Sequence, residues 1–279
     1  MSDATIPSRI GVCSWSLRPE SPTDLVASLD LLGISTVQLD LGPLLDEAPG
    51  WLEAPAILTD AKVRIASGML AFPGEDYSTL ESIRATGGVA PDERWDANLD
   101  RATRAAALAK QLQIHLVTCH AGFIPEEPDD PSIEIMQERL SAICDVFEEH
   151  GVELALETGQ EHADSLLLLL SSLDRSSLGV NFDPANMILY GMGDPTEGFR
   201  TLAPFVKQVH VKDALPAETL GEWGREVPVG DGAVGWSAFC GVLQQLLPKV
   251  DLMIEREAGE DRIADIAKAR DLLFKMCRG

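Results

Sequence analysis

The chain has 279 residues, 45% of them hydrophobic, and its formal net charge at pH 7 is −23. This length suits one barrel of about 250 residues around one large core, so we expect a single domain over residues 1–279. The excess of acidic residues argues against nucleic acid and anionic membranes as partners, because proteins that bind polyanions normally present a basic surface.

Eight short apolar runs recur along the chain, and each is followed by a segment that suits a helix. The runs are Arg9–Ser16, Thr36–Leu41, Lys62–Ser67, Ile114–His120, Val152–Glu157, Leu178–Asp183, Val206–Lys212 and Asp251–Glu255. Their nearly continuous apolar character is typical of strands that are buried on both faces of a parallel sheet. Strands and helices that alternate in this way predict an α/β fold, a closed (β/α)8 TIM barrel. The alternative is an open, doubly wound sheet.

Helix starts are marked most clearly at Ser21 and Asp194. Each offers a capping oxygen, is followed by proline, and has an acid three residues later, Asp24 and Glu197 respectively. Further helices are expected over residues 95–112, 133–150, 163–173, 236–247 and 261–276, and residues 51–61 are the only helix available to the second unit. Long loops are expected over 70–94, 122–130 and 214–229. In a barrel, loops that follow strands cover the active-site end.

The cysteines and the chain start carry little functional signal. The five cysteines are scattered and include no C-x-x-C pair, so we expect buried free thiols: Cys13, Cys119, Cys144, Cys240 and Cys277. The first residues, MSDATIPSRIG, do not resemble a signal peptide, and the leucine run at 166–170 is too short to span a bilayer. We therefore expect a cytoplasmic protein, whose oligomeric state the sequence leaves open.

Potential metal ligands end four consecutive predicted strands. They are Glu157, Asp183, His210 and Glu255. The C-terminal ends of barrel strands converge near the axis, so these side chains would meet at one point. Any one of them could simply end a strand, and His210 between two valines could belong to the core. Four from consecutive strands favour a single divalent metal ion. Three oxygens and one nitrogen suit Mn²⁺, Mg²⁺, Co²⁺ or Zn²⁺, of which Mn²⁺ is our first choice.

A divalent ion at this point would favour one kind of chemistry. It would polarise the carbonyl of a bound hydroxy-ketone or hydroxy-aldehyde and lower the cost of forming an enediolate. Glu157 and Glu255, on opposite sides of the carbon, could then remove and return its proton as general base and acid. The alternative is that both glutamates are ligands only.

Four short motifs resemble a known family. ALETG with Glu157, NFDPAN with Asp183, VHVKD with His210 and IEREAG with Glu255 are similar to motifs of the sugar phosphate isomerase/epimerase group of xylose isomerase-like TIM barrels. The group includes ketose 3-epimerases, hydroxypyruvate isomerase, and inosose isomerase and dehydratase. The resemblance implies one divalent metal ion with the two glutamates as acid and base. It does not fix the substrate.

The substrate contacts depart from those of ketose 3-epimerases. These carry a histidine where this chain has Asn186 and an arginine where it has Pro216. Lys212, Asp213 and Arg225 are therefore candidates to hold substrate oxygens, together with Asn186. Arg225 could instead pair with an adjacent glutamate, Glu222 or Glu226.

Other candidates for substrate contact lie at the mouth of the predicted barrel. His120 ends the fourth strand and Trp15 lies at the end of the first, so both are expected near the substrate. Phe123 and Trp223 could form apolar walls, whereas Trp236 is expected to plug the barrel. Residues 160–162 are read as a helix start with His162 in solvent.

Residues 230–235 match G-x-G-x-x-G, but they follow a long loop, so we expect a glycine turn near the site and no dinucleotide site. The sequence also shows no basic or amide-lined pocket for phosphate, which favours an unphosphorylated substrate.

The leading hypothesis is therefore a metal-dependent isomerase or epimerase of a small sugar or cyclitol. A dehydratase or lyase could use the same residues on a keto-sugar or keto-inositol. An endonuclease of this barrel type, with three zinc ions and several histidines, is disfavoured by the five histidines and the acidic charge. A barrel that only binds sugar or metal is the non-enzymatic alternative.

Overall fold

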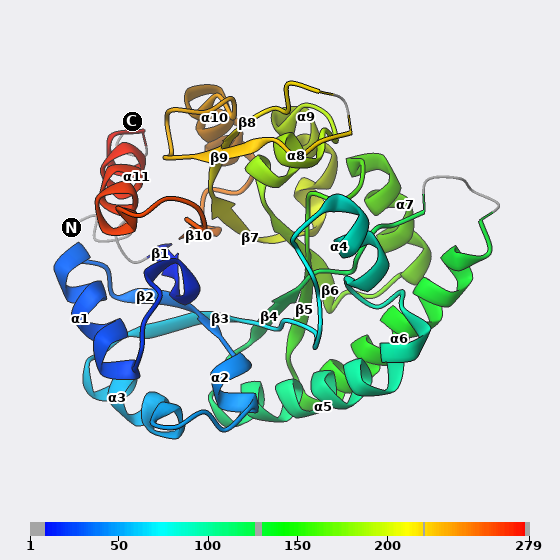
Figure 1. Cartoon of the computed structure of the whole chain (residues 1–279), viewed down its shortest axis with the longest axis horizontal. Helices are drawn as coiled ribbons and strands as arrows, with labels where there is room; N and C mark the ends of the chain where they lie inside the picture. The colour runs from blue at the N-terminus through cyan, green and yellow to red at the C-terminus, as the bar shows by residue number, and fades with distance from the viewer. Residues whose placement is uncertain (1–8, 126–129, 220, 277–279) are drawn as a thin grey trace.

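The computed structural model describes residues 9–125, 130–219 and 221–276 and shows a closed barrel of parallel strands surrounded by helices (Figure 1). The barrel order is β1, β10, β7, β6, β5, β4, β3 and β2. The strands are β1 (Ile10–Cys13), β2 (Thr36–Asp40), β3 (Arg64–Met69), β4 (Leu116–Cys119), β5 (Glu153–Glu157), β6 (Leu178–Phe182), β7 (Val206–Val211) and β10 (Asp251–Ile254). A separate antiparallel pair consists of β8 (Asp213–Leu215) and β9 (Arg225–Val227). The predicted (β/α)8 barrel is confirmed.

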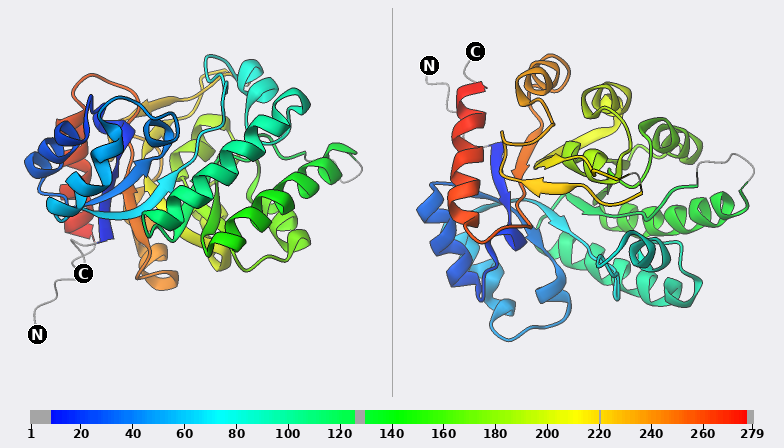
Figure 2. Two further views of the ribbon diagram at one scale, coloured as in Figure 1. Left: turned by 90° about the horizontal axis from the view of Figure 1, so that it is seen from below. Right: turned by 45° about the horizontal axis from the view of Figure 1, so that its top comes forward.

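Helices fill the connections between the barrel strands. The α-helices are α1 (Pro22–Leu32), α2 (Gly42–Leu45), α3 (Ala54–Asp60), α4 (Leu80–Thr86), α5 (Trp95–Gln111), α6 (Ser132–His150), α7 (Ala163–Leu173), α8 (Pro184–Tyr190), α9 (Pro195–Leu202), α10 (Trp236–Leu246) and α11 (Arg262–Met276). Short 3-10 helices are η2 (Ser14–Leu17), η3 (Trp51–Glu53), η4 (Asp92–Arg94) and η5 (Ala203–Phe205). Figure 2 shows α11 beside α1, which places the last described helix against the first. No helix in the described ranges has both the length and the apolar character needed to cross a membrane.

The predicted helix starts at Ser21 and Asp194 are confirmed. The Ser21 side chain accepts a hydrogen bond from the Asp24 amide, and Asp194 accepts from the amides of Thr196 and Glu197. The third strand begins two residues later than predicted, because Lys62 adopts a left-handed turn with φ of 59° after α3. Two segments expected to be loops contain regular structure, namely α4 within residues 70–94 and the β8–β9 hairpin within residues 214–229.

The apolar core lies mainly between the barrel and its helices. Phe182 on β6 contacts Phe199 on α9 and Phe239 on α10, with ring centroids 5.2 and 6.0 Å apart. Cys13, Cys119, Cys144 and Cys240 are buried free thiols, as expected, and Cys277 lies outside the described residues. The inside of the barrel is different, because hydrogen-bonded polar side chains on several strands are buried there, including Gln38, Asn181 and Gln208. This polar interior supports the site described next.

Candidate functional site

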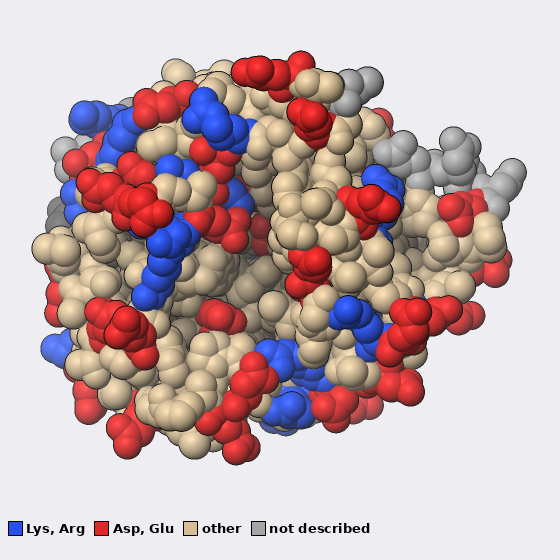
Figure 3. Space-filling view, viewed as in Figure 1, with Lys and Arg blue, Asp and Glu red and all other residues tan. Residues whose placement is uncertain are grey.

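A cavity of about 570 Å³ opens where the barrel strands end. Figure 3 shows the molecule hollowed at the centre of this face, with acidic side chains around the hollow. The residues that line the cavity include Trp15, Asp40, Met69, Glu75, Tyr77, His120, Glu157, Asn186, Tyr190, Lys212, Trp223, Glu226, Glu255 and Glu257. They come from strand ends around the barrel and from the long loops above it.

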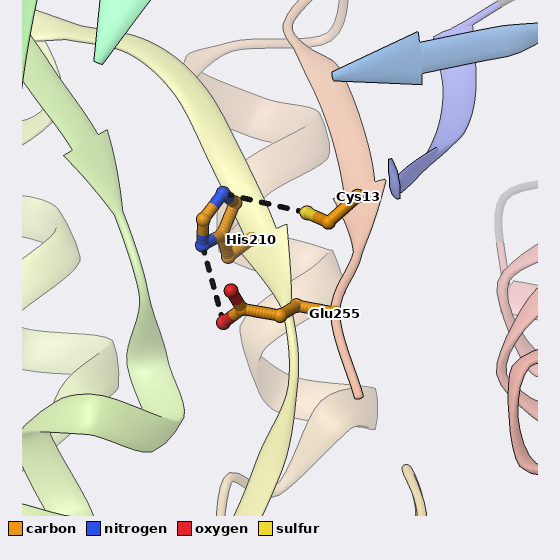
Figure 4. A group of neighbouring side chains, drawn as sticks. All are labelled: Cys13, His210 and Glu255. Carbon is orange, nitrogen blue, oxygen red and sulfur yellow. Dashed lines mark hydrogen bonds and ion pairs between the residues drawn. The ribbon is translucent and has the colours of Figure 1, made fainter. Parts of the chain in front are cut away.

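The four side chains expected to bind metal lie together at the mouth of the barrel, where Glu157 and Glu255 line the cavity and Asp183 and His210 are fully buried beside them. Glu157 is the last residue of β5, Asp183 follows β6, His210 lies near the end of β7, and Glu255 follows β10. His210 Nδ1 is 3.3 Å from Glu157 Oε1, 3.7 Å from Asp183 Oδ2 and 3.4 Å from Glu255 Oε2. One ligand atom from each residue lies within 4.8 Å of every other. Figure 4 shows the His210 ring with one nitrogen facing Glu255 and the other facing Cys13.

Two properties of this cluster fit a divalent cation: the chemical type of its ligand atoms, and the presence of buried polar atoms that have no hydrogen-bond partner. Among the described residues, Asp183 Oδ2 and His210 Nδ1 are buried and have no hydrogen-bond partner. Three buried carboxylates that face one imidazole are costly unless a positive charge compensates them. Hard oxygen donors with one imidazole nitrogen match the preferences of Mn²⁺, Mg²⁺ and related ions.

The turn after β6 fixes the orientation of the Asp183 carboxylate. Asp183 caps the N-terminus of α8, and its Oδ1 accepts hydrogen bonds from the amides of Ala185 at 2.8 Å and Asn186 at 3.0 Å. Its own amide donates to Thr158 Oγ1 at 2.8 Å. Because the cap uses Oδ1, the second oxygen is left pointing toward His210.

The two glutamates of the cluster have different partners. Glu157 Oε1 accepts a hydrogen bond from Asn186 Nδ2 at 2.9 Å, and its Oε2 lies 3.8 Å from His120 Nε2. Glu255 Oε1 accepts from Trp15 Nε1 at 2.8 Å, and its Oε2 lies 2.9 Å from Lys212 Nζ. Each carboxylate is therefore held by residues that also line the cavity.

Charges in the cluster shift the pKa values of its members. Burial raises the pKa of Glu255, but the neighbouring charges of Lys212 and His210 outweigh it and hold the pKa well below its ordinary value. Burial acts on Glu157 in the same way, and His210 and His120 bring its pKa below the ordinary value. Burial lowers the pKa of His210, but Glu157 and other neighbours raise it well above 6.5. Without a metal ion, a proton on His210 therefore compensates the carboxylates.

Lys212 is a buried cation at the edge of the cluster. Its side chain is 3% exposed, and its Nζ lies 2.6 Å from Glu257 Oε2 and 3.3 Å from Asn186 Oδ1, in addition to the contact with Glu255. One lysine thus links a carboxylate of the cluster to a carboxylate at the cavity rim.

The structure brings four of the six residues expected to contact substrate to the cavity, namely Trp15, His120, Asn186 and Lys212. It does not bring Asp213 and Arg225 there. Arg225 is exposed on β9, where it pairs with Leu215. Asp213 follows Lys212 at the start of β8, and its buried carboxylate accepts five hydrogen bonds from the amides of Ala214, Gly230, Gly232 and Val234 and from Trp236 Nε1.

The glycine-rich segment at residues 230–235 wraps around Asp213. A Cβ at Gly232 would lie only 2.0 Å from Asp213 Oδ1, so this close approach requires glycine. The segment is the expected glycine turn, but it supports Asp213 and does not line the cavity. Trp236, which begins α10, is buried as expected of a plug.

Several residues at the cavity were not identified from the sequence. Asp40 ends β2 and shows the same strand-end signal as the four cluster residues, so the sequence could have indicated it. Glu75 and Tyr77 lie in the long loop after β3 and carry no such signal. Burial raises the pKa values of Asp40 and Glu75.

Two further sets of residues complete the surroundings of the site. Tyr190 forms an aromatic wall, with its ring centroid 5.9 Å from those of Phe123 and Trp223. In the turn after β5, His162 caps α7 and is exposed, as expected, whereas Glu161 beside it is buried with 4% exposure.

Comparisons with known proteins agree with this fold. The family model described as xylose isomerase-like TIM barrel matches residues 29–276. A xylose isomerase domain protein from Planctomyces limnophilus is 30% identical, with a TM-score of 0.85 and 96% of each chain covered. The curated protein YihM of Escherichia coli K12 is 27% identical over 109 residues, which is 38% of this chain and only 33% of that protein.

More distant structures share the fold. The probable 3-DHS dehydratase AsbF from Bacillus anthracis is 19% identical, with a TM-score of 0.73, and the match covers 95% of this chain and 98% of AsbF. An L-ribulose 3-epimerase is 16% identical, with a TM-score of 0.71, and the match covers 97% of this chain and 94% of the epimerase chain. Taken with the family match over most of its length, these likenesses show that the chain belongs to the xylose isomerase-like TIM-barrel family.

Proposed function

We propose that this protein is a divalent-metal-dependent isomerase or epimerase that moves a proton at the carbon next to the carbonyl of a small sugar or cyclitol. The observation that carries the proposal is that Glu157 and Glu255 come from different strand ends, have ligand oxygens within 4.8 Å of one another, and are each held by a different cavity residue. General base and acid groups on two sides of a carbon are what such a proton transfer requires.

A metal ion would be held by Glu157, Asp183, His210 and Glu255, with Mn²⁺ as the proposed ion and Mg²⁺, Co²⁺ or Zn²⁺ as alternatives. When bound, the ion supplies Lewis acidity that polarises the substrate carbonyl. The assignment uses no thiolate, because the Cys13 thiol faces the other nitrogen of the His210 ring (Figure 4).

The protein side chains would transfer the proton, position the two carboxylates and contact the substrate. One glutamate removes the proton and the other, or the same one after the substrate turns, returns it. Asn186 and Trp15 hold the two carboxylates through hydrogen bonds of 2.9 and 2.8 Å. His120, near Glu157 Oε2, is placed to contact a substrate hydroxyl.

The charge of the cavity favours a neutral substrate. Its acidic lining residues are Asp40, Glu75, Glu157, Glu226, Glu255 and Glu257, and Lys212 is the only lysine or arginine among the described lining residues. Lys212 already pairs with Glu255 and Glu257. A phosphate or carboxylate group would be repelled here, whereas sugar hydroxyls can donate hydrogen bonds to the carboxylates. We therefore propose an unphosphorylated substrate.

The test is proton exchange with solvent. Protein loaded with Mn²⁺ is incubated in D₂O with a panel of neutral ketoses and keto-cyclitols, and the products are analysed by mass spectrometry and NMR. We expect one deuterium at the carbon next to the carbonyl, and loss of this label in Glu157→Gln and Glu255→Gln. Turnover that leaves the product unlabelled would point to a hydride shift or another reaction and overturn the proposal.

A dehydratase remains the second candidate because the fold is shared with the probable dehydratase AsbF and the same residues could eliminate water. A product lighter than the substrate by one water would identify it. Metal analysis that finds three zinc ions per chain would favour an endonuclease. Full activity in Glu157→Gln would show that this cluster only binds its ligand.

A further inference from the structure

Gln38 is a fully buried polar residue inside the barrel, on the side of His210 away from the carboxylates. It lies on β2, is 0% exposed, and its Oε1 is 2.7 Å from His210 Nε2. Barrel interiors are usually filled by branched apolar side chains, and a buried amide is costly without good hydrogen bonds. The position therefore calls for a specific explanation.

The orientation of the Gln38 amide is fixed by a second hydrogen bond. Its Nε2 donates to Thr118 Oγ1 on β4 at 2.8 Å, and the Thr118 hydroxyl proton is directed to Met69 Sδ at 3.0 Å. Because the hydroxyl hydrogen is used there, Thr118 Oγ1 acts as an acceptor toward Gln38. The Gln38 oxygen must then be the atom that faces His210.

The neighbours of His210 Nε2 leave Gln38 as its acceptor. Asn181 Nδ2, an N–H donor, lies 2.9 Å away and would donate only to an unprotonated Nε2. The shorter contact, 2.7 Å to a Gln38 oxygen that can only accept, favours a proton on Nε2, with an Asn181 N–H directed to Glu157 Oε2 at 3.4 Å. Cys13 Sγ is 3.7 Å from Nε2 and donates to Gln38 Oε1 at 3.4 Å. Figure 4 shows the thiol beside one ring nitrogen of His210 and Glu255 beside the other.

We propose that Gln38 is a positioning residue that fixes the tautomer of His210. Gln38 Oε1 accepts a hydrogen bond from the protonated Nε2 of His210. Nδ1, the nitrogen that faces Glu157, Asp183 and Glu255, then carries no proton and has a free lone pair. A histidine can bind metal only through an unprotonated nitrogen, and the hydrogen bond made by its other nitrogen sets which one is free. The inference rests on the proposed metal-dependent function.

Metal affinity is the first measurement. Gln38→Met removes the acceptor in a side chain of similar length, and Gln38→Glu keeps an acceptor oxygen. Gln208→Met is the matched control in the same polar interior, where the Gln208 side chain hydrogen-bonds with Ser67 and Asn181. We expect Gln38→Met to bind Mn²⁺ about 10- to 100-fold more weakly, and the other two variants to stay close to wild type. Equal affinity of Gln38→Met and wild type would overturn the inference.

The tautomer itself is the second measurement, and it does not depend on activity. In protein labelled with ¹⁵N-histidine and loaded with diamagnetic Zn²⁺, we expect a slowly exchanging proton on Nε2 of His210, which Gln38→Met loses. If Gln38→Met does not fold, the wild-type spectrum decides, because a proton on Nδ1 would contradict the assignment. If the protein binds metal normally but incorporates no deuterium into the product, the proposed isomerase function is refuted. The role of Gln38 in metal binding is not affected by that result.

Discussion

The wild-type protein should lose much of its stability at alkaline pH because of Glu161, and the Glu161→Gln variant should not show this loss. Glu161 is 4% exposed in the turn after β5. Burial and repulsion from Glu157 raise its pKa from 4.5 to about 8, against the lowering effect of hydrogen bonds from the amides of Gly159 and Gln160. The difference, about 8 minus 4.5, is about 3.5 pH units. At about 1.4 kcal/mol per unit it corresponds to at most about 5 kcal/mol.

The sign follows from which state binds the proton. Between pH 4.5 and about 8, folded Glu161 keeps a proton that the unfolded chain has released. Stability from this group is therefore fully present below pH 4.5, falls as the pH rises, and is lost above about pH 8. Glutamine stays neutral and still offers an oxygen to the two backbone amides. The free energy of unfolding of Glu161→Gln should therefore not show this decrease with pH.

Urea unfolding of the metal-free protein from pH 5 to pH 9 measures the effect. The free energy of unfolding of Glu161→Gln minus that of wild type should grow with pH by several kcal/mol, because other titrating groups cancel in the difference. Glu149→Gln, an exposed change on α6, is the control and should show no such trend. A difference that is constant with pH, or that grows as the pH falls, would refute the reasoning.

Three further predictions concern the lysine, the metal and the glycine turn. Lys212→Met should destabilise the metal-free protein by about 3–5 kcal/mol in urea unfolding, since it leaves the buried Glu255 carboxylate without its cation. The surface change Lys207→Met, which breaks a pair with Glu153, should cost about 1 kcal/mol or less, and equal losses would contradict this account. EDTA should lower the melting temperature, and the affinity for Mn²⁺, measured by titration, should fall as the pH falls, because protons held on His210 by Glu157 and its other neighbours compete with the ion. A pH-independent affinity would show that His210 is not a ligand. Gly232→Ala should cost about 1–3 kcal/mol, since its Cβ would meet Asp213 Oδ1 at 2.0 Å. Gly241→Ala in α10, with open space around its Cβ, should be neutral or stabilising by up to about 1 kcal/mol, so a loss at both positions would point to a general effect.

Local patterns were sufficient to predict the barrel and the position of the cluster. Each of the four strands that carry the cluster is an apolar run with its polar ligand at or next to its C-terminal end, and in a parallel barrel all such ends face the same way. Glu157, Asp183, His210 and Glu255 therefore meet for a reason that is already present in each short segment. The two helix caps, at Ser21 and Asp194, are equally local and were predicted correctly.

Whether a residue on a loop reaches the cavity could be decided only from the tertiary structure. Lys212 and Asp213 are adjacent in the chain, but the first reaches the cavity and the second is enclosed by the glycine turn, because side chains alternate along an extended segment and the fold decides which side meets the site. The sequence placed Glu161 in a helix start without any sign of its burial, and only packing buries it.

The sequence by itself determined the eight barrel strands, their order along the chain and the four ligand residues at their ends, since these depend on local composition. The environment of those residues was decided only in three dimensions. Gln38 and His210 are 172 positions apart, and each belongs to an ordinary strand until closure of the barrel sets them 2.7 Å from each other. Hydrogen bonds between distant strands carry no local signal, and they orient the ligands that the strand ends supply.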